Sequence, residues 1–271
     1  MSWQAVDPRD THLARTDTRA TFDRALRFVV IIAGTLALIA ITIATATALA
    51  TLGFNFQVWS AGALSMEDAL RIEATANFTA FAFLLFASLW FVRQVTPSPA
   101  AAGFQPQLEG HGPALALGGL ITILWITKFA IVALDPGSPA TAVTASQVVL
   151  PDAGSARLLA IGVTALVGPV AEEILFRGAL LGGLLALGLR PMTALLIATI
   201  AFTGSHINHG AIQLIGVAGI GLAFGWVFIK TRSLVAPIGL HVFHNAMVVV
   251  CAEFARYQVE ASRSVNAVMG G

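Results

Sequence analysis

Residues 28–53 read FVVIIAGTLALIAITIATATALATLG, an apolar run that contains no charged side chain. An α-helix rises about 1.5 Å per residue, so about 20 apolar residues span the roughly 30 Å hydrocarbon core of a bilayer. The apolar core of a signal peptide is shorter, at about 7–15 residues. We therefore interpret this run as a retained membrane-spanning helix.

Further apolar runs follow along the chain, separated by segments that contain Pro, Gly, Lys or Arg. They cover residues 74–92, 114–134, 157–187, 192–206, 211–229 and 234–252. Only α-helices and closed β-barrels satisfy their backbone hydrogen bonds in lipid, and these runs are too long and continuous for barrel strands. The sequence therefore predicts an all-α, polytopic membrane helical bundle of about seven transmembrane helices, within a range of six to eight.

The composition agrees with a protein that faces the lipid bilayer. Hydrophobic residues make up 57% of the 271 residues and charged residues 11%, whereas a typical soluble domain is about 25% charged. The net charge of +1 and the lack of a basic patch give no reason to expect a nucleic-acid partner. The single cysteine, Cys251, excludes a disulfide framework and a cysteine-based metal cluster.

The same patterns divide the chain into four segments. Residues 1–27 form a polar N-terminal tail, either mobile or a short interfacial helix, and residues 28–150 form transmembrane helices without a motif. Residues 151–252 form the predicted catalytic core, and residues 253–271 a polar C-terminal tail. Lys and Arg are more frequent in the tail and loops that lie on the same side of the membrane as the N-terminus. This bias predicts that the N-terminus is inside and the C-terminus outside. The Ala- and Arg-rich, Lys-poor composition favours a bacterial inner membrane.

A few ionisable side chains interrupt the apolar runs. A charge at the centre of a bilayer costs at least about 2.5–3.5 kcal/mol, so such residues are candidates for function. All but the first of them lie in the second half of the chain: Lys128, Glu172, Glu173, Arg177, His206, His241 and His244. This clustering points to one chemical site within the membrane.

Two adjacent glutamates lie in the run 157–187. Glu173 and Arg177 are four residues apart, so they share a helix face and can form an ion pair. Glu172 is rotated by about 100° from Glu173 and has no cation three or four residues away in its own helix. We expect Glu173 to support the structure and Glu172 to face a polar cavity and react.

Histidines follow on two later runs. His206 ends the run 192–206, and His209, in the loop after it, is expected to be solvated. His241 and Asn245 are four residues apart and share one face, where together they can hydrogen bond to an oxyanion or a water. His244 is close enough in sequence to share that face, although a role in helix packing is the simpler interpretation.

These residues form three motifs in order, namely Glu-Glu-x-x-x-Arg at 172–177, Phe-x-x-x-His at 202–206 and His-x-x-x-Asn at 241–245. In this order, on separate apolar helices, they resemble the CAAX-protease and bacteriocin-processing (Abi) family of membrane peptidases. That family includes the type II CAAX prenyl endopeptidases. The resemblance covers about residues 155–250.

The resemblance implies a role for each motif residue. Glu172 would activate the attacking water, and His206 would hold that water or a metal. His241 and Asn245 would stabilise the oxyanion, and Glu173 and Arg177 would fix the helix geometry.

Two mechanisms stay open from the sequence. In one, Glu172 and His206 activate water directly; in the other, Glu172, His206 and His241 bind Zn²⁺ and leave an open position for water. Either would make the protein an intramembrane endopeptidase that acts on a peptide or protein substrate at the membrane. The alternatives are a non-enzymatic scaffold or bacteriocin-immunity protein on the same fold, and a proton-coupled transporter, since Glu and His also form proton relays.

Overall fold

The computed structural model describes residues 8–104, 112–152, 154–208 and 210–269, and within these ranges it contains helices and no strand. The helices are α1 (Pro8–Ala61), α2 (Met66–Val95), α3 (Gly112–Leu134), α4 (Pro139–Ala145), α5 (Gly154–Gly162), η1 (Val163–Val167), α6 (Gly168–Glu173), η2 (Ile174–Leu181), α7 (Gly182–Ala186), α8 (Pro191–Gly204), α9 (Ala211–Thr231) and α10 (Val235–Met269). In the described part of the chain, 6 helices are long and apolar enough to cross a membrane, and α8 is a shorter apolar helix. The predicted all-α membrane bundle is confirmed.

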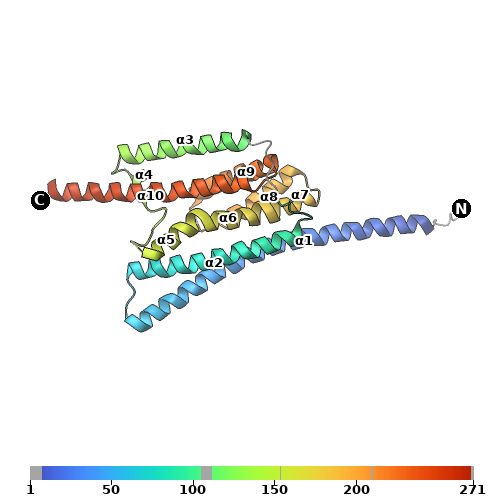
Figure 1. Ribbon diagram of the computed structural model, residues 1–271, viewed down its shortest axis with the longest axis horizontal. Helices are drawn as coiled ribbons and strands as arrows, with labels where there is room; N and C mark the ends of the chain where they lie inside the picture. The colour runs from blue at the N-terminus through green and yellow to red at the C-terminus, as the bar shows by residue number, and fades with distance from the viewer. Residues whose placement is uncertain (1–7, 105–111, 153, 209, 270–271) are drawn as a thin grey trace.

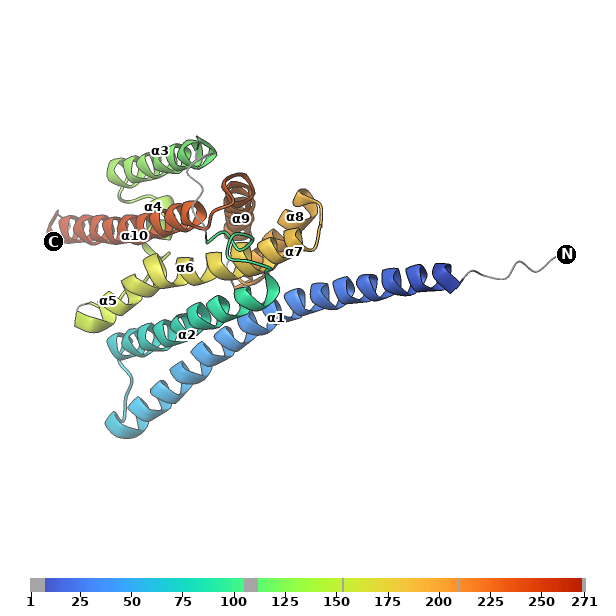
Figure 2. The same cartoon turned by 45° about the vertical axis from the view of Figure 1, so that its right-hand side comes forward.

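The helices pack side by side around the continuous run from α5 to α7 (Figures 1 and 2). On one side of this run lie α10 and α9, with α3 outside them, and on the other side lies α2, with α1 outside it. The two ends of the chain lie at opposite ends of the bundle (Figure 1). This arrangement agrees with the predicted N-inside, C-outside orientation, although the side on which each terminus lies stays a prediction.

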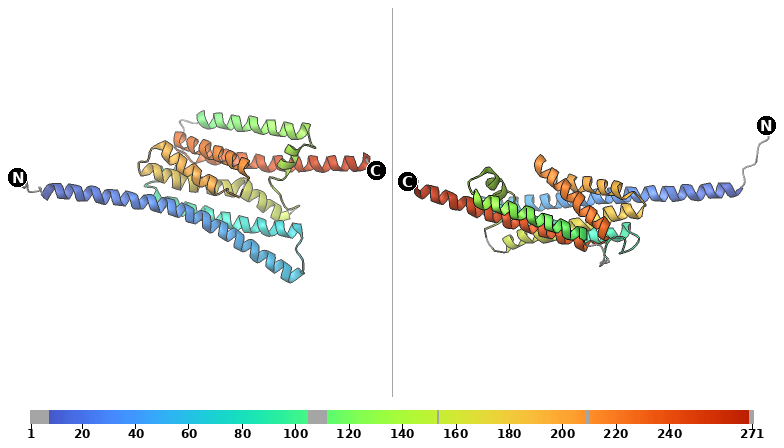
Figure 3. Two further views of the ribbon diagram at one scale, coloured as in Figure 1. Left: turned by 180° about the vertical axis from the view of Figure 1, so that it is seen from behind. Right: turned by 90° about the horizontal axis from the view of Figure 1, so that it is seen from above.

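The polar terminal segments extend the membrane helices. α1 begins at Pro8 and continues without a break through 54 residues, so it is about 80 Å long and must project beyond the bilayer. Figure 3 shows its N-terminal part extending away from the bundle. α10 likewise continues through the predicted C-terminal tail to Met269. The described parts of both tails are therefore helical, while residues 1–7 and 270–271 lie outside the described residues.

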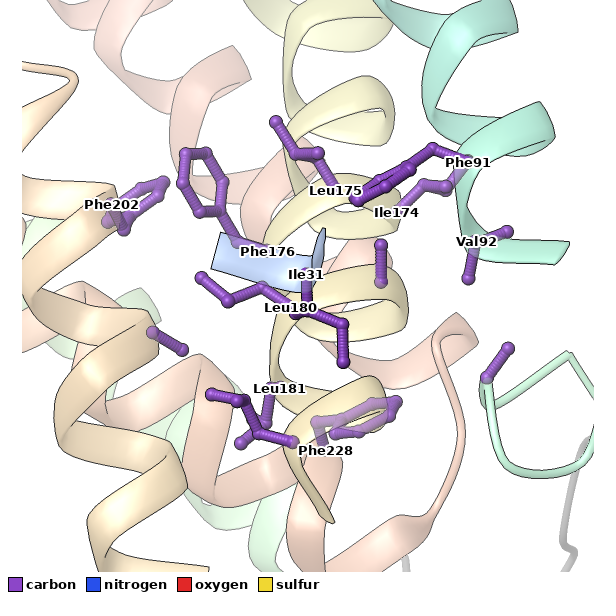
Figure 4. Close-up of a cluster of buried hydrophobic side chains, with 14 of the residues drawn as sticks. Ile31, Phe91, Val92, Ile174, Leu175, Phe176, Leu180, Leu181, Phe202 and Phe228 are labelled. Carbon is purple, nitrogen blue, oxygen red and sulfur yellow. The ribbon is translucent and has the colours of Figure 1, made fainter. Parts of the chain in front are cut away.

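The core of the bundle lies where η2 meets its neighbours, as Figure 4 shows. Leu175, Leu180 and Leu181 are each 0% exposed, and Phe176 contacts Phe202 edge to face with ring centroids 5.2 Å apart. Away from this core, large apolar side chains are exposed, for example Phe86 at 70%. Such exposure is expected of helices whose outer faces contact lipid.

The central run departs from regular α-helix at two places. The run predicted at 157–187 is one helical stretch, Gly154–Ala186, but η1 and η2 within it are π-helical. A Cβ at Gly168 would lie 2.7 Å from the Val163 carbonyl oxygen, five residues back, so the close approach after η1 requires glycine. π-helical turns are rare and occur often at functional sites. Here η2 begins directly after Glu173, and η1 ends five residues before Glu172.

The shortness of α8 brings polar residues to the interior of the bundle. This helix begins with Pro191 at its first turn and contains 14 residues, so it is about 21 Å long and shorter than the roughly 30 Å of hydrocarbon. The chain therefore leaves the helix before it reaches the far side of the membrane. His206 lies just after this end, in the connection to α9.

Candidate active site

A cavity of about 550 Å³ lies between α2, the central run, α8, α9 and α10. Four predicted site residues line it, namely Glu172, His206, His241 and Asn245. They come from α6, from the connection after α8, and from α10. The structure thus brings one residue or more of each motif to one cavity, although the chemical role of each stays a prediction.

Glu173 lies at the centre of a buried polar cluster beside the cavity. Its Oε1 atom forms an ion pair with Nη1 of Arg177 at 2.9 Å and accepts a hydrogen bond from the His241 Nδ1–H at 2.7 Å. The Glu173 and Arg177 side chains are 0% and 2% exposed. The ion pair expected from the four-residue spacing is therefore present, and it also holds the histidine of a second helix.

Aromatic rings enclose this ion pair. The Arg177 guanidinium lies 4.5 Å from the centroid of the Phe202 ring and 5.8 Å from that of Phe224. Phe202 is also the first residue of the second motif. Its ring therefore brings Arg177 of η2 into contact with α8, the helix that leads to His206. Cation–π contacts of this kind stabilise a guanidinium that is removed from water.

The bond to Glu173 fixes the orientation of the His241 ring. A carboxylate only accepts hydrogen bonds, so Nδ1 carries the proton and Nε2 points the other way. Nε2 lies 3.8 Å from Oε2 of Glu172, which is too long for a direct hydrogen bond but short enough for one water to contact both atoms. The Glu172 side chain is 15% exposed and lines the cavity, in contrast to its neighbour Glu173.

His206 has a comparable arrangement. Its Nδ1 lies 2.8 Å from the Phe202 carbonyl oxygen and 3.1 Å from the Ser205 hydroxyl. The carbonyl oxygen can only accept, so Nδ1–H donates and Nε2 carries the lone pair. His206 and His241 are therefore held in the same tautomer by backbone or carboxylate acceptors. His209 lies outside the described residues.

Asn245 is oriented by the first π-helical segment. Its amide Nδ2 donates to the Thr164 carbonyl oxygen in η1 at 2.9 Å. This contact uses one of the two N–H bonds of the amide. The other N–H is the one that could donate to a substrate, and Asn245 lines the cavity one helical turn after His241.

The residues suit zinc in their donor chemistry but are not gathered around one point. Metal-bound histidines usually donate their second ring N–H to a carboxylate or a carbonyl, as His241 and His206 do. However, within residues 8–104, 112–152, 154–208 and 210–269 no three His, Cys, Asp or Glu side chains are placed to hold a metal ion. Zinc therefore stays a prediction.

Polar residues from the first 150 residues, where no motif is predicted, also line the cavity. Asn77 of α2 and Gln147 of the α4–α5 connection both line it. Asn77 interrupts the apolar run 74–92, which is a signal that sequence inspection could have used. Gln147 lies in a polar connection, where nothing in the sequence distinguishes it from a solvated loop residue.

The protein is thus a helical membrane protein with a glutamate, histidine and asparagine site in a cavity between its helices. Residues 154–247 match a family described as type II CAAX prenyl endopeptidase Rce1-like, and this segment contains all three motifs. The chain is also 32% identical over 100 residues to CAAX prenyl protease 2 of Arabidopsis thaliana, a match that covers 30% of this chain and 32% of that protein. No solved structure matches.

Residues 154–247 are therefore similar to the CAAX-protease family, and the resemblance drawn from the three motifs is confirmed. The match spans about a third of the length of the curated relative. Residues before 154, including α1 to α4, lie outside the family match.

Proposed function

We propose that this protein is an intramembrane endopeptidase that hydrolyses a peptide bond with a water activated by Glu172. The observation that carries the proposal is that residues of all three family motifs line one cavity, with Glu172 facing His241 at 3.8 Å. The family match over the same segment supports this assignment.

Glu172 is the proposed general base. Glu173 is committed to Arg177 and His241, whereas Glu172 lines the cavity and can bind a water. The water would donate to the Glu172 carboxylate and to the lone pair on Nε2 of His206. When it attacks the peptide carbonyl, its proton moves to Glu172, which then protonates the leaving amine.

Asn245 and His241 are the proposed oxyanion donors. Asn245 has one N–H held by Thr164 and a second for the oxyanion. His241 can donate from Nε2 in its imidazolium form, which takes its second proton from cavity water before the substrate binds, and Glu173 at Nδ1 would balance the charge. Donors fixed in advance stabilise the transition state because they need not reorient during the reaction.

The Glu173–Arg177 pair is proposed to position His241. It touches neither the cavity water nor a peptide in this scheme, because both side chains are almost fully buried. If a zinc ion binds, Glu172, His206 and His241 would hold it, and it would polarise the attacking water.

The cavity lies toward the end of the bundle at which the C-terminus lies. Its lining includes Gln147 in the connection before α5, His206 in the connection after α8, and Gln213 near the start of α9. We propose that water and substrate enter from this end. With the N-terminus inside, this end faces the outer side of a bacterial inner membrane.

Peptidomics of membrane fractions tests the proposal without a known substrate. Cells that produce the wild-type protein are compared with cells that produce Glu172→Gln at the same level. We expect peptides that carry a new terminus only with the wild-type protein. The matched control is Glu260→Gln, an exposed glutamate of α10 away from the cavity, which should give the wild-type pattern. Identical peptides from all three strains would refute the proposal and favour a scaffold.

A further inference from the structure

Lys128 is an intramembrane cation that the proposed mechanism does not use. It lies in α3, outside the family match, within an 18-residue window of mean hydropathy 2.0. Its Nζ donates to Oε1 of Gln147 at 2.8 Å and lies 4.9 Å from the centroid of the Trp125 ring. Placing an ammonium group in such a helix is costly, so a functional reason for it is the default expectation.

Lys128 differs in its partners from the arginines of the bundle that form ion pairs. Arg177 pairs with Glu173, and both Arg157 and Arg256 pair with Glu253. In the described part of the chain no carboxylate contacts Lys128; its polar partner is the neutral amide of Gln147. An ammonium has three N–H donors, so Lys128 retains donors and a full charge for another ligand.

Lys128 lines a second cavity, of about 510 Å³, between α3, α9 and α10. The walls of this cavity are mainly apolar, with side chains such as Leu124, Ile220 and Phe224. A chamber of this kind with one cation fits an apolar chain that carries one negative group. Pockets of this size commonly hold small ligands or short peptide segments.

The two cavities are neighbours. Gln147, Gly216, Ile220, His244 and Val248 line both of them. Trp125, which contacts the Lys128 ammonium, also donates from Nε1 to Nδ1 of His244 at 3.4 Å. A peptide bound beside Glu172 can therefore extend past His244 into the apolar cavity and reach Lys128.

We infer that Lys128 binds a carboxylate of the peptide substrate and so selects peptides with a negative group on one side of the cleaved bond. The inference rests on the proposed function, because the peptide must lie in the neighbouring catalytic cavity. The carboxylate can be the C-terminus of the peptide or an Asp or Glu side chain. These two sources share the same chemistry and are separated below.

Binding in an inactive background tests this inference apart from cleavage. Full-length Glu172→Gln protein in phosphatidylcholine nanodiscs is titrated with fluorescent Ala/Leu nonapeptides. One pair ends in a carboxylate or a carboxamide. A second pair has a carboxamide end and carries an internal Glu or Gln. We expect at least one acidic peptide to bind about tenfold more tightly than its neutral partner, because hydrogen bonds to charged groups are stronger than neutral ones.

Variants of the two lysines of the chain test whether Lys128 causes the preference for acidic peptides. Lys128→Gln should abolish the acidic preference and leave the affinity for neutral peptides unchanged, and Lys128→Arg should keep it. Lys230→Gln is the matched control, since Lys230 also lies over a tryptophan, 5.9 Å from the Trp226 ring, but outside both cavities. If Lys128 had a purely structural role, Lys128→Gln would lower the affinity for acidic and neutral peptides alike.

Three results would overturn the inference. The first is equal affinity, or no binding, for all four peptides. The second is an acidic preference that survives Lys128→Gln. The third is loss of the preference when anionic phosphatidylglycerol is added, which would assign Lys128 to a lipid phosphate. Cleavage by the wild-type protein is measured separately. An acidic preference without cleavage would leave the Lys128 site standing and refute the peptidase.

Discussion

Replacing Arg177 with methionine should destabilise the protein strongly. The guanidinium forms an ion pair with the Glu173 carboxylate, which is 0% exposed, and Arg177 itself is 2% exposed. Methionine keeps an apolar chain of similar length, so the main loss is that of the positive charge beside Glu173. Removing one partner of a buried ion pair typically costs about 3–5 kcal/mol, because the remaining charge stays buried without compensation.

The double variant Glu173→Gln with Arg177→Met separates charge from packing. It removes both charges together, so we expect it to recover most of the stability that Arg177→Met loses. Glutamine can still accept from the Nδ1–H of His241, since its amide oxygen occupies a similar place. The free energy of unfolding is measured for each variant by titration with sodium dodecyl sulfate in mixed micelles.

The Glu67–Arg71 pair is the matched control. It also spans four residues of one helix, at 3.0 Å, but its side chains are 25% and 57% exposed. Exposed ion pairs contribute little to stability, so the free energy of unfolding of Arg71→Met should be close to that of the wild type. The reasoning would be refuted if Arg177→Met were no more destabilising than Arg71→Met. It would also be refuted if the double variant were as unstable as Arg177→Met alone.

The remaining predictions concern the cavity. Asn245→Ala should slow cleavage about 10²–10³-fold, as loss of one oxyanion donor does elsewhere, and an unchanged rate constant in purified protein would argue against that role. Asn208 is exposed in the connection after α8, two residues after His206. Asn208→Cys in a Cys251→Ser background should react with a membrane-impermeant maleimide from the side opposite the N-terminus; reaction only from the N-terminal side would contradict the proposed opening. Chelation should abolish cleavage if Glu172, His206 and His241 hold zinc, whereas full activity in protein shown by elemental analysis to be metal-free would refute zinc.

The sequence predicts the features that depend on one helix alone. Long apolar runs predict the spans because a bilayer has a fixed thickness, and the four-residue spacing predicts the Glu173–Arg177 pair because one helical turn brings those side chains together. The helix ends were less predictable. α1 continues through polar residues to Pro8, and α4 forms in a segment expected to be a loop.

Contacts between helices could not be predicted from the sequence. Glu173 and His241 are 68 residues apart, and their bond depends on how α10 packs against α6. The π-helical segments also lack a sequence signal, because an extra residue per turn is a response to packing. The residue spacing therefore distinguished the expected role of Glu172 from that of Glu173, but only the structure shows that Glu173 also holds His241.

Cleavage by purified protein tests the central claim most directly. A substrate found by peptidomics is incubated with wild-type or Glu172→Gln protein in liposomes in H₂¹⁸O, and the products are analysed by mass spectrometry. We predict that the wild-type protein forms a new C-terminal carboxylate that contains ¹⁸O, and that Glu172→Gln forms none while remaining folded. Equal cleavage by both proteins would contradict a water activated by Glu172.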